Sequence, residues 1–212
     1  MDVGVLGSGV VAKQLAAGFA SRGHRVTIGT RDPAKLAEWL DGEGKGVTAG
    51  SFTEAASAGD VVCLAVLGEA AEELVRSLAG ELGDCVLIDA TNPLEYHPGG
   101  PPTLFVGHDD SLGERVQRAA PSARVVKCFN TVGNTFFVDP DLPGGPPTMF
   151  YCGNDDAAKA TVGEVLDSFV WQSDDLGGIE GSRYLEALCM IWVLHGFRAG
   201  SWNHAFKLLV SS

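Results

Sequence analysis

The sequence predicts an α/β fold in which a doubly wound, mostly parallel sheet is followed by a small C-terminal helical part. Short β-branched runs alternate with longer segments of helical period, which is the pattern of parallel strands joined by crossover helices. A glycine-rich turn directly follows the first of these runs. The chain has 212 residues, 45% of them hydrophobic, which is enough for one sizeable core but not for several independent domains.

The expected strands are six apolar or β-branched runs, at residues 3–6, 25–29, 61–66, 85–89, 124–129 and 148–152. The last run follows a Pro-Gly-Gly-Pro-Pro-Thr string at 143–148, and the same string at 98–103 precedes the apolar triplet 104–106. Proline restricts the backbone and glycine permits tight reversals, so both strings are interpreted as rigid turns that lead into strands.

Helix starts are predicted by residues that can satisfy the free backbone N–H groups of a first turn. The signals are an Asp-Pro pair, two Ser-x-x-Glu capping boxes and an Asp-Asp pair. They lie at Asp32-Pro33, Ser51 to Glu54, Ser111 to Glu114 and Asp155-Asp156. The expected helices include residues 12–22, 157–169, 179–195 and 202–209.

Near Ser173 the pattern typical of a sheet gives way to helical periodicity. We therefore expect a main domain at residues 1–172 and a C-terminal helical segment at 173–212 that closes the cleft of that domain. The 179–195 helix is apolar nearly all round, so it is interpreted either as a core helix packed on the sheet or as a homodimer interface.

The composition limits the kinds of partner. Fifteen Lys and Arg against 27 Asp and Glu give a net charge of −12, which disfavours nucleic acid and anionic membrane surfaces. A small-molecule partner is expected instead. The five cysteines form no C-x-x-C pair, and neither a signal segment nor an apolar run of about 20 residues is evident. A cytoplasmic protein with reduced thiols and no metal site is expected.

The first turn is the strongest chemical signal. The string Gly7-Ser8-Gly9-Val10-Val11-Ala12 lies between an apolar strand and a helix. Gly7 permits the tight turn, Gly9 lets the backbone approach a pyrophosphate, and Ala12 keeps the helix close to the sheet. Because the free N–H groups and the dipole of a helix start attract phosphates, this context predicts a NAD(P)-binding Rossmann fold.

The residues after the second strand predict which dinucleotide binds. An acidic side chain that would accept the ribose hydroxyls of NAD is replaced by Thr30 and Arg31. A hydroxyl and a guanidinium suit the additional phosphate of NADP(H). Lys35 is interpreted either as a second cation for this phosphate or as an ordinary solvated lysine.

Four strings together carry a family resemblance. The chain resembles the NADP oxidoreductases that depend on the deazaflavin coenzyme F420, and also the cytosolic NADPH-binding domain of the six-transmembrane ferric reductases. The strings are Gly7 to Ala12, Ile28-Gly29-Thr30-Arg31-Asp32-Pro33, Ala90-Thr91-Asn92-Pro93-Leu94 and Val126-Lys127-Cys128-Phe129-Asn130-Thr131-Val132-Gly133.

The resemblance implies hydride transfer between NADP(H) and coenzyme F420 or a flavin-like ring, both held in one cleft. Carried over by position, Ser8 to Val11 would hold the pyrophosphate, and Thr30, Arg31 and Lys35 the ribose phosphate. The nicotinamide side would be lined by Ala65, Val66, Asn92 and the loop from Asn130 to Asn134. For Asn92 and Asn130 an ordinary role as turn residues is the alternative.

The acceptor is the open part of this hypothesis. Coenzyme F420 is polyanionic, so binding it to an acidic protein would need a local basic patch from residues such as Lys127 and Arg183. No Tyr-x-x-x-Lys pair is present, and direct transfer between two rings needs proximity rather than a protein acid or base. The alternatives are a flavin-mediated NADPH reductase of ferric iron or quinone-like acceptors and a non-enzymatic NADP(H)-sensing module.

Overall fold

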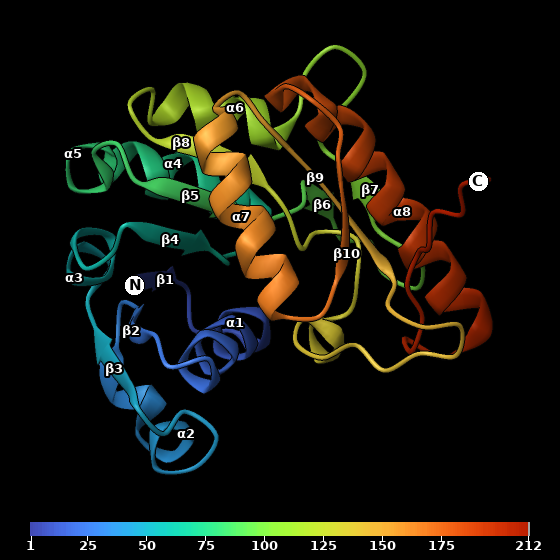
Figure 1. Cartoon of the computed structure of the whole chain (residues 1–212). Helices are drawn as coiled ribbons and strands as arrows, with labels where there is room; N and C mark the ends of the chain where they lie inside the picture. The colour runs from blue at the N-terminus through green and yellow to red at the C-terminus, as the bar shows by residue number, and fades with distance from the viewer. Residues whose placement is uncertain (212) are drawn as a thin grey trace.

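The computed structural model describes residues 1–211 and is built on a central eight-stranded sheet (Figure 1). The strand order is β10-β9-β8-β5-β4-β1-β2-β3, and the six strands from β3 to β8 in this order are parallel. This is the strand order of a Rossmann fold, so the predicted fold class is confirmed. The strands are β1 (Asp2–Leu6), β2 (Arg25–Gly29), β3 (Val47–Gly50), β4 (Val61–Leu64), β5 (Val86–Asp89), β8 (Arg124–Lys127), β9 (Thr148–Gly153) and β10 (Gln172–Asp175).

Helices cover both faces of the sheet. The helices α1 and α7 pack on one face, whereas α3, α4, α5 and α6 pack on the other (Figure 1). The helices are α1 (Val10–Ser21), α2 (Ala37–Asp41), α3 (Phe52–Ser57), α4 (Gly68–Ser77), α5 (Ala79–Leu82), α6 (Leu112–Ala119), α7 (Asp156–Ser168) and α8 (Ser182–Ala199), with 3-10 turns η1 (Pro33–Leu36), η2 (Asn134–Phe136) and η3 (Ile179–Gly181).

Because helices cover both faces of the sheet, the strands are continuous apolar runs instead of alternating apolar and polar residues. In β4, Val61 and Cys63 belong to the core cluster on the α1 and α7 face, while Val62 and Leu64 belong to the cluster on the opposite face. Both sets of side chains are buried, which is the arrangement expected for a parallel sheet covered on both sides.

All six predicted strands are present, but two further strands of the sheet were not predicted. The β3 strand is only Val47–Gly50, and β10 has the polar sequence Gln-Ser-Asp-Asp at an exposed edge, so neither shows a strong hydrophobic signal. The β9 strand runs antiparallel to β8, and β10 runs parallel to β9. A short hairpin of β6 (Leu94–Glu95) and β7 (Thr103–Leu104) encloses the first proline-rich string.

Most of the predicted helix starts are confirmed. The α3 helix has a complete capping box, in which the Glu54 N–H donates to Ser51 Oγ and the Ser51 N–H donates to Glu54 Oε2. The α6 helix has the Ser111 half of such a box, and Asp155 Oδ1 accepts the N–H of Ala158 at the start of α7. Asp32 is the N-cap residue and Pro33 the first residue of a 3-10 turn, as predicted, but the Asp32 carboxylate makes no capping hydrogen bond.

The helix expected at residues 202–209 is wrong, because this tail has no regular secondary structure. Gly200 ends α8 in the left-handed conformation. The tail then follows β9 instead: Phe206 O accepts the N–H of Thr148, and the Leu208 N–H donates to Thr148 Oγ1. An isolated helix of this length has little stability of its own, so these tertiary contacts decide the conformation.

The helix predicted at residues 179–195 lies slightly later in the chain, because residues 179–181 form the 3-10 turn η3 and α8 begins at Ser182. The α8 helix reaches Ala199 and lies at the periphery of the molecule beside β9 and β7 (Figure 1). Within residues 1–211, no helix combines the length and the apolar character that crossing a lipid bilayer requires.

Candidate functional site

The turn after β1 packs between the carboxyl ends of the neighbouring strands β2 and β4. The N–H of Gly7 donates to Gly29 O at the end of β2, over 3.0 Å. Its φ is +137°, and a Cβ at this position would lie 2.3 Å from Ala65 O, just beyond β4. Only glycine fits here, and the chain is thereby directed into α1 at the point where the strand order of the sheet reverses.

The first turn of α1 is left free for a ligand. Gly9 is the N-cap residue, no side chain caps the helix, and its first turn contains no acidic residue. A Cβ on Gly9 would have no atom within 4 Å, so open space lies against this backbone. The unpaired N–H groups of the first turn, with the helix dipole behind them, form a cradle that fits the pyrophosphate of a dinucleotide.

The structure brings the two predicted phosphate-binding segments together. Thr30 Oγ1 donates to Ser8 Oγ over 3.1 Å, and the Thr30 N–H donates to Gly50 O at the end of β3. Arg31 is exposed and has no ion-pair partner within residues 1–211. Lys35 Nζ is also exposed, but it lies 3.7 Å from Asp32 Oδ2. Of the two cations, Arg31 is therefore the more available for a phosphate.

A further cation, which the sequence reasoning missed, lies beside this segment. Lys13 Nζ is 5.8 Å from the centre of the Trp39 ring, and both residues line an open pocket of about 320 Å³ together with Lys35. Lys13 directly follows the glycine-rich string, so its position in the first turn of α1 was a signal in the sequence.

Ala65 and Val66, predicted as the last two residues of the strand, lie just beyond the carboxyl end of β4, which ends at Leu64. The Ala65 N–H donates to Leu6 O over 2.9 Å, which continues the pairing of β4 with β1 beyond the last strand residue. Leu67, the next residue, and Val10 at the start of α1 are both exposed apolar side chains. These residues therefore give an apolar border to the carboxyl edge of the sheet.

Asn92 and Asn130 form a bonded pair across 38 residues of sequence. Asn92 Nδ2 donates to Asn130 O, and Asn130 Nδ2 donates to Asn92 Oδ1, both over 2.9 Å. Asn130 Nδ2 also donates to Leu185 O in α8, over 3.1 Å. Asn130 is 4% exposed, and within residues 1–211 its Oδ1 has no hydrogen-bond donor. Asn134 lies at the start of η2 and makes no hydrogen bond with either residue.

A buried acceptor without a donor is costly, so Asn130 Oδ1 suits a ligand that carries an N–H group. The carboxamide of nicotinamide is such a group. The chemistry of this atom and the open cradle at Gly9 together fit NADP(H): the cradle would contact its central pyrophosphate and Asn130 its nicotinamide end.

Lys127 does not contribute to a basic surface. Its side chain is fully buried at the end of β8, where Nζ lies 2.9 Å from Asp89 Oδ2 and 3.0 Å from Glu186 Oε1. Burial by itself lowers the pKa of Lys127, but the two carboxylates outweigh this effect and raise the pKa. The Glu186 carboxylate also accepts the N–H groups of Leu112 and Gly113 at the start of α6.

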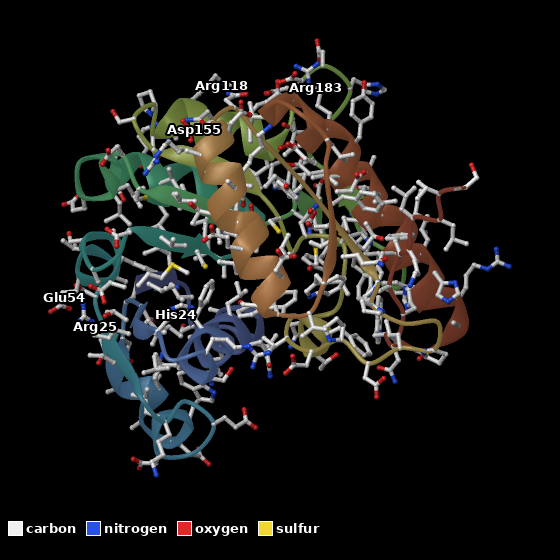
Figure 2. All side chains as sticks on the ribbon, viewed as in Figure 1. His24, Arg25, Glu54, Arg118, Asp155 and Arg183 are labelled. Carbon is white, nitrogen blue, oxygen red and sulfur yellow. The ribbon has the colours of Figure 1, made fainter. Side chains whose placement is uncertain are left out.

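Arg183 is engaged as well. Its guanidinium binds Glu114 through Nε and Nη2, over 2.8 and 2.5 Å, and this pairing raises the pKa of Arg183. It lies at the same end of the molecule as Arg118 and Asp155 (Figure 2). The basic patch that a polyanionic coenzyme would need is therefore not supplied by Lys127 and Arg183, because carboxylates occupy both cations.

A second open pocket, of about 440 Å³, lies at the opposite edge of the sheet. It is lined by residues at the amino ends of β1 and β2, among them His24 and the ion-paired Arg25 and Asp2 (Figure 2). Ligands of open parallel sheets bind at the carboxyl edge, so this pocket is separate from the candidate site.

Comparison with known proteins identifies relatives along most of the chain. Residues 2–93 match the family described as NADP oxidoreductase coenzyme F420-dependent. The F420-dependent NADP reductase of Methanothermobacter thermautotrophicus is 27% identical over 201 residues, which cover 89% of this chain and 86% of that protein. Metalloreductase STEAP3 of Rattus norvegicus is 30% identical over 187 residues, which cover 88% of this chain but only 36% of the length of that protein.

A solved structure extends the similarity to the whole chain. A protein from Arthrobacter sp. FB24, provisionally described as an F420-dependent NADP reductase, is 38% identical and superposes with a TM-score of 0.93. The match covers 99% of this chain and 100% of that one. This identity over the whole length of that protein, together with the family match at residues 2–93, shows that the chain belongs to the family of coenzyme F420-dependent NADP oxidoreductases.

Proposed function

We propose that this protein transfers hydride between NADP(H) and the deazaflavin coenzyme F420, with a flavin-like ring as the alternative acceptor of the same class. The observation that carries the proposal is the pairing of an uncapped, open helix start at Gly9 with a buried, unpartnered acceptor at Asn130 Oδ1. The matches to F420-dependent NADP reductases over nearly their whole length support the choice of acceptor.

In this proposal the adenosine end of NADP(H) is held by the first two strands. The backbone N–H groups from Ser8 to Val11 bind the pyrophosphate, and Gly7 sets the turn that presents them. Thr30, Arg31 and Lys35 bind the ribose phosphate, with Thr30 fixed against Ser8 by their hydrogen bond.

The nicotinamide end is held at the carboxyl ends of β4, β5 and β8. Asn130 Oδ1 accepts the carboxamide N–H, while Asn92 holds the Asn130 side chain in place. Ala65 and Val66 border the ring, and Asn134 contributes from η2. The bound dinucleotide supplies a hydride, so the work of these residues is to orient the ring and to exclude water rather than to move a proton.

A second candidate is a flavin-mediated NADPH reductase of ferric iron or quinone-like acceptors. The observation that favours it is the 30% identity to metalloreductase STEAP3 along 88% of this chain. The chain spans about a third of the length of that relative, so reduction of ferric iron by this protein is proposed here separately from the activity of the relative.

The test is anaerobic NADPH oxidation by the purified protein with coenzyme F420, with FMN or FAD alone, and with flavin plus ferric chelate. We expect turnover with coenzyme F420 to exceed turnover with the other acceptors, and to fall in the Gly9→Ala variant when NADPH is subsaturating. Turnover that requires both flavin and ferric iron would replace the proposal by the second candidate. Tight NADPH binding without turnover of any acceptor would indicate a sensing module.

A further inference from the structure

The loop at residues 130–134, which follows β8, has little backbone support of its own. Phe129, just before it, is buried and has a φ of +63°. A bulky side chain adopts this left-handed conformation only where the surrounding structure imposes it. Within residues 1–211, no backbone N–H from residue 130 to residue 133 donates a hydrogen bond. The position of the 130–134 loop therefore depends on the elements that pack against it.

The α8 helix contacts this loop at two points. Leu185 O accepts a hydrogen bond from Asn130 Nδ2, over 3.1 Å. About two turns further along the helix, the Trp192 ring lies against Gly133. A Cβ on Gly133 would be 3.3 Å from Trp192 Cζ2 and 3.4 Å from the backbone oxygen of Trp202 in the tail. The loop thus contacts both α8 and the tail that follows it.

A reciprocal pair of hydrogen bonds fastens the tail to α8. Gly200 ends the helix in the left-handed conformation, and the chain turns back along it (Figure 1). Trp192 Nε1 donates to His204 O over 2.8 Å, and His204 Nε2 donates to Trp192 O over 3.0 Å. The two rings are stacked, with centres 4.8 Å apart. We call this arrangement the Trp192–His204 clasp.

We propose that the Trp192–His204 clasp positions the 130–134 loop for the nicotinamide end of NADP(H). Trp192 and His204 are then positioning residues that act through the loop. The inference rests on the proposed function, which places the nicotinamide beside this loop. A loop without backbone pairing moves when its support moves, and a displacement of about 1 Å at the reacting ring can slow a reaction by roughly 100-fold. The adenosine end, held at the turns after β1 and β2, should not depend on the clasp.

The test compares two ligands by calorimetric titration of His204 variants. NADPH carries both ends of the dinucleotide, whereas adenosine 2′,5′-bisphosphate carries the ribose phosphate but no nicotinamide. His204→Ala removes the donor and the stacked ring, so we expect the dissociation constant for NADPH to rise by roughly tenfold. The dissociation constant for the bisphosphate should stay within about twofold of wild type. Equal weakening of the two ligands would indicate a general loss of structure and would overturn the proposal.

Two further histidine variants sharpen this comparison. His204→Gln keeps an N–H donor for Trp192 O and should recover most of the affinity for NADPH. The matched control is His24→Ala, because His24 is also partly buried beside an aromatic ring, with its centre 5.7 Å from that of Phe19, but lies at the amino edge of the sheet. This control should change neither dissociation constant. No recovery in His204→Gln, or an equal loss in His24→Ala, would overturn the proposal.

Gly133→Ala tests the same contact from the side of the loop. The φ of Gly133 is −68°, which alanine can adopt, but the added methyl group would press on Trp192 and on the Trp202 carbonyl. We expect kcat with NADPH and coenzyme F420 to fall by roughly tenfold, with unchanged affinity for the bisphosphate. Wild-type kcat and NADPH affinity in this variant would overturn the proposal. Absence of turnover in the wild type would refute the proposed function, whereas the binding comparison of the His204 variants still tests the clasp.

Discussion

Gly7 and Gly9 belong to the same string, but the structure gives them opposite reasons to be glycine. A Cβ on Gly7 would collide with Ala65 O, whereas a Cβ on Gly9 would meet no atom of the protein. The φ of Gly9 is −75°, which any residue can adopt. The first glycine is therefore required by folding, and the second is expected to be required by the ligand.

This difference predicts separate results for Gly9→Ala and Gly7→Ala. Gly9→Ala should keep the unfolding free energy within about 0.5 kcal/mol of wild type, while raising the dissociation constant for NADPH by roughly tenfold or more. Gly7→Ala should lose stability by roughly 1–3 kcal/mol from backbone strain, plus the cost of the overlap. Denaturant unfolding and calorimetric titration measure the two effects. Wild-type NADPH affinity in Gly9→Ala would contradict the placement of the pyrophosphate.

Arg31 decides the preference between dinucleotides in this proposal. Arg31→Ala should weaken binding of NADPH by about 1.5–3 kcal/mol, the value of a charged hydrogen bond, and leave the binding of NADH unchanged. The control is Arg25→Ala, because Arg25 is an exposed arginine at the amino end of β2, the strand whose carboxyl end precedes Arg31. Equal losses for both dinucleotides would show that Arg31 does not contact the additional phosphate.

At the scale of elements, buried charges join α8 to the sheet. Lys127 lies in β8, Asp89 ends β5, and Glu186 lies on the inner face of α8, where it also accepts two N–H groups from α6. Asp89 Oδ1 is occupied by the N–H and the hydroxyl of Thr91. Each carboxylate thus has several donors. The cluster therefore fixes β5, β8, α6 and α8 in one arrangement.

Removing the Lys127 cation should lower the free energy of unfolding. Lys127→Met leaves two carboxylates buried without their counter-charge, and we expect a loss of about 3–5 kcal/mol in unfolding free energy. Arg124→Met, at the amino end of the same strand, is the control, because that guanidinium donates to the backbone carbonyl of Asp84 and is partly exposed. Glu186→Gln, which keeps an acceptor oxygen, should lose less. Unfolding in guanidinium chloride measures all three variants, and equal stabilities of Lys127→Met and Arg124→Met would contradict the prediction.

At the scale of the whole molecule, the core contains five free thiols, all of them buried. Burial raises the pKa of Cys152 to about 11 and those of Cys85 and Cys189 to about 12, and it raises the pKa values of Cys63 and Cys128 as well. Because these folded-state pKa values exceed those of the unfolded chain, the folded protein retains thiol protons that the unfolded chain releases.

The stability of the protein should therefore fall at alkaline pH. The contribution of the thiols is complete below about pH 8.5, the usual pKa of cysteine, and is lost as the pH rises toward the folded-state values. In this pH window each thiol lowers the free energy of unfolding by about 1.4 kcal/mol per pH unit. The raised pKa of Lys127 acts in the same direction, above about pH 10. Unfolding free energies measured from pH 7 to alkaline pH check this, and a constant value would contradict it.

The fold class and the first half of the candidate site could be predicted because their signals are local. A β-branched run, a glycine turn and a helix start lie next to one another in the chain, so the phosphate cradle at Gly7 to Val11 is a property of one short segment. The capping box at Ser51 and Glu54 is local for the same reason. The boundary expected at residues 172 and 173 remains a prediction, and β10 runs across it.

The tertiary structure decided what depends on residues far apart in the chain. It paired Asn92 with Asn130, buried Lys127 between two carboxylates, and placed the tail along β9 instead of in a helix. In each case the partner lies tens of residues away, so only the packed sheet could supply it. Local conformation follows from neighbours along the chain, whereas burial and charge pairing follow from neighbours in space.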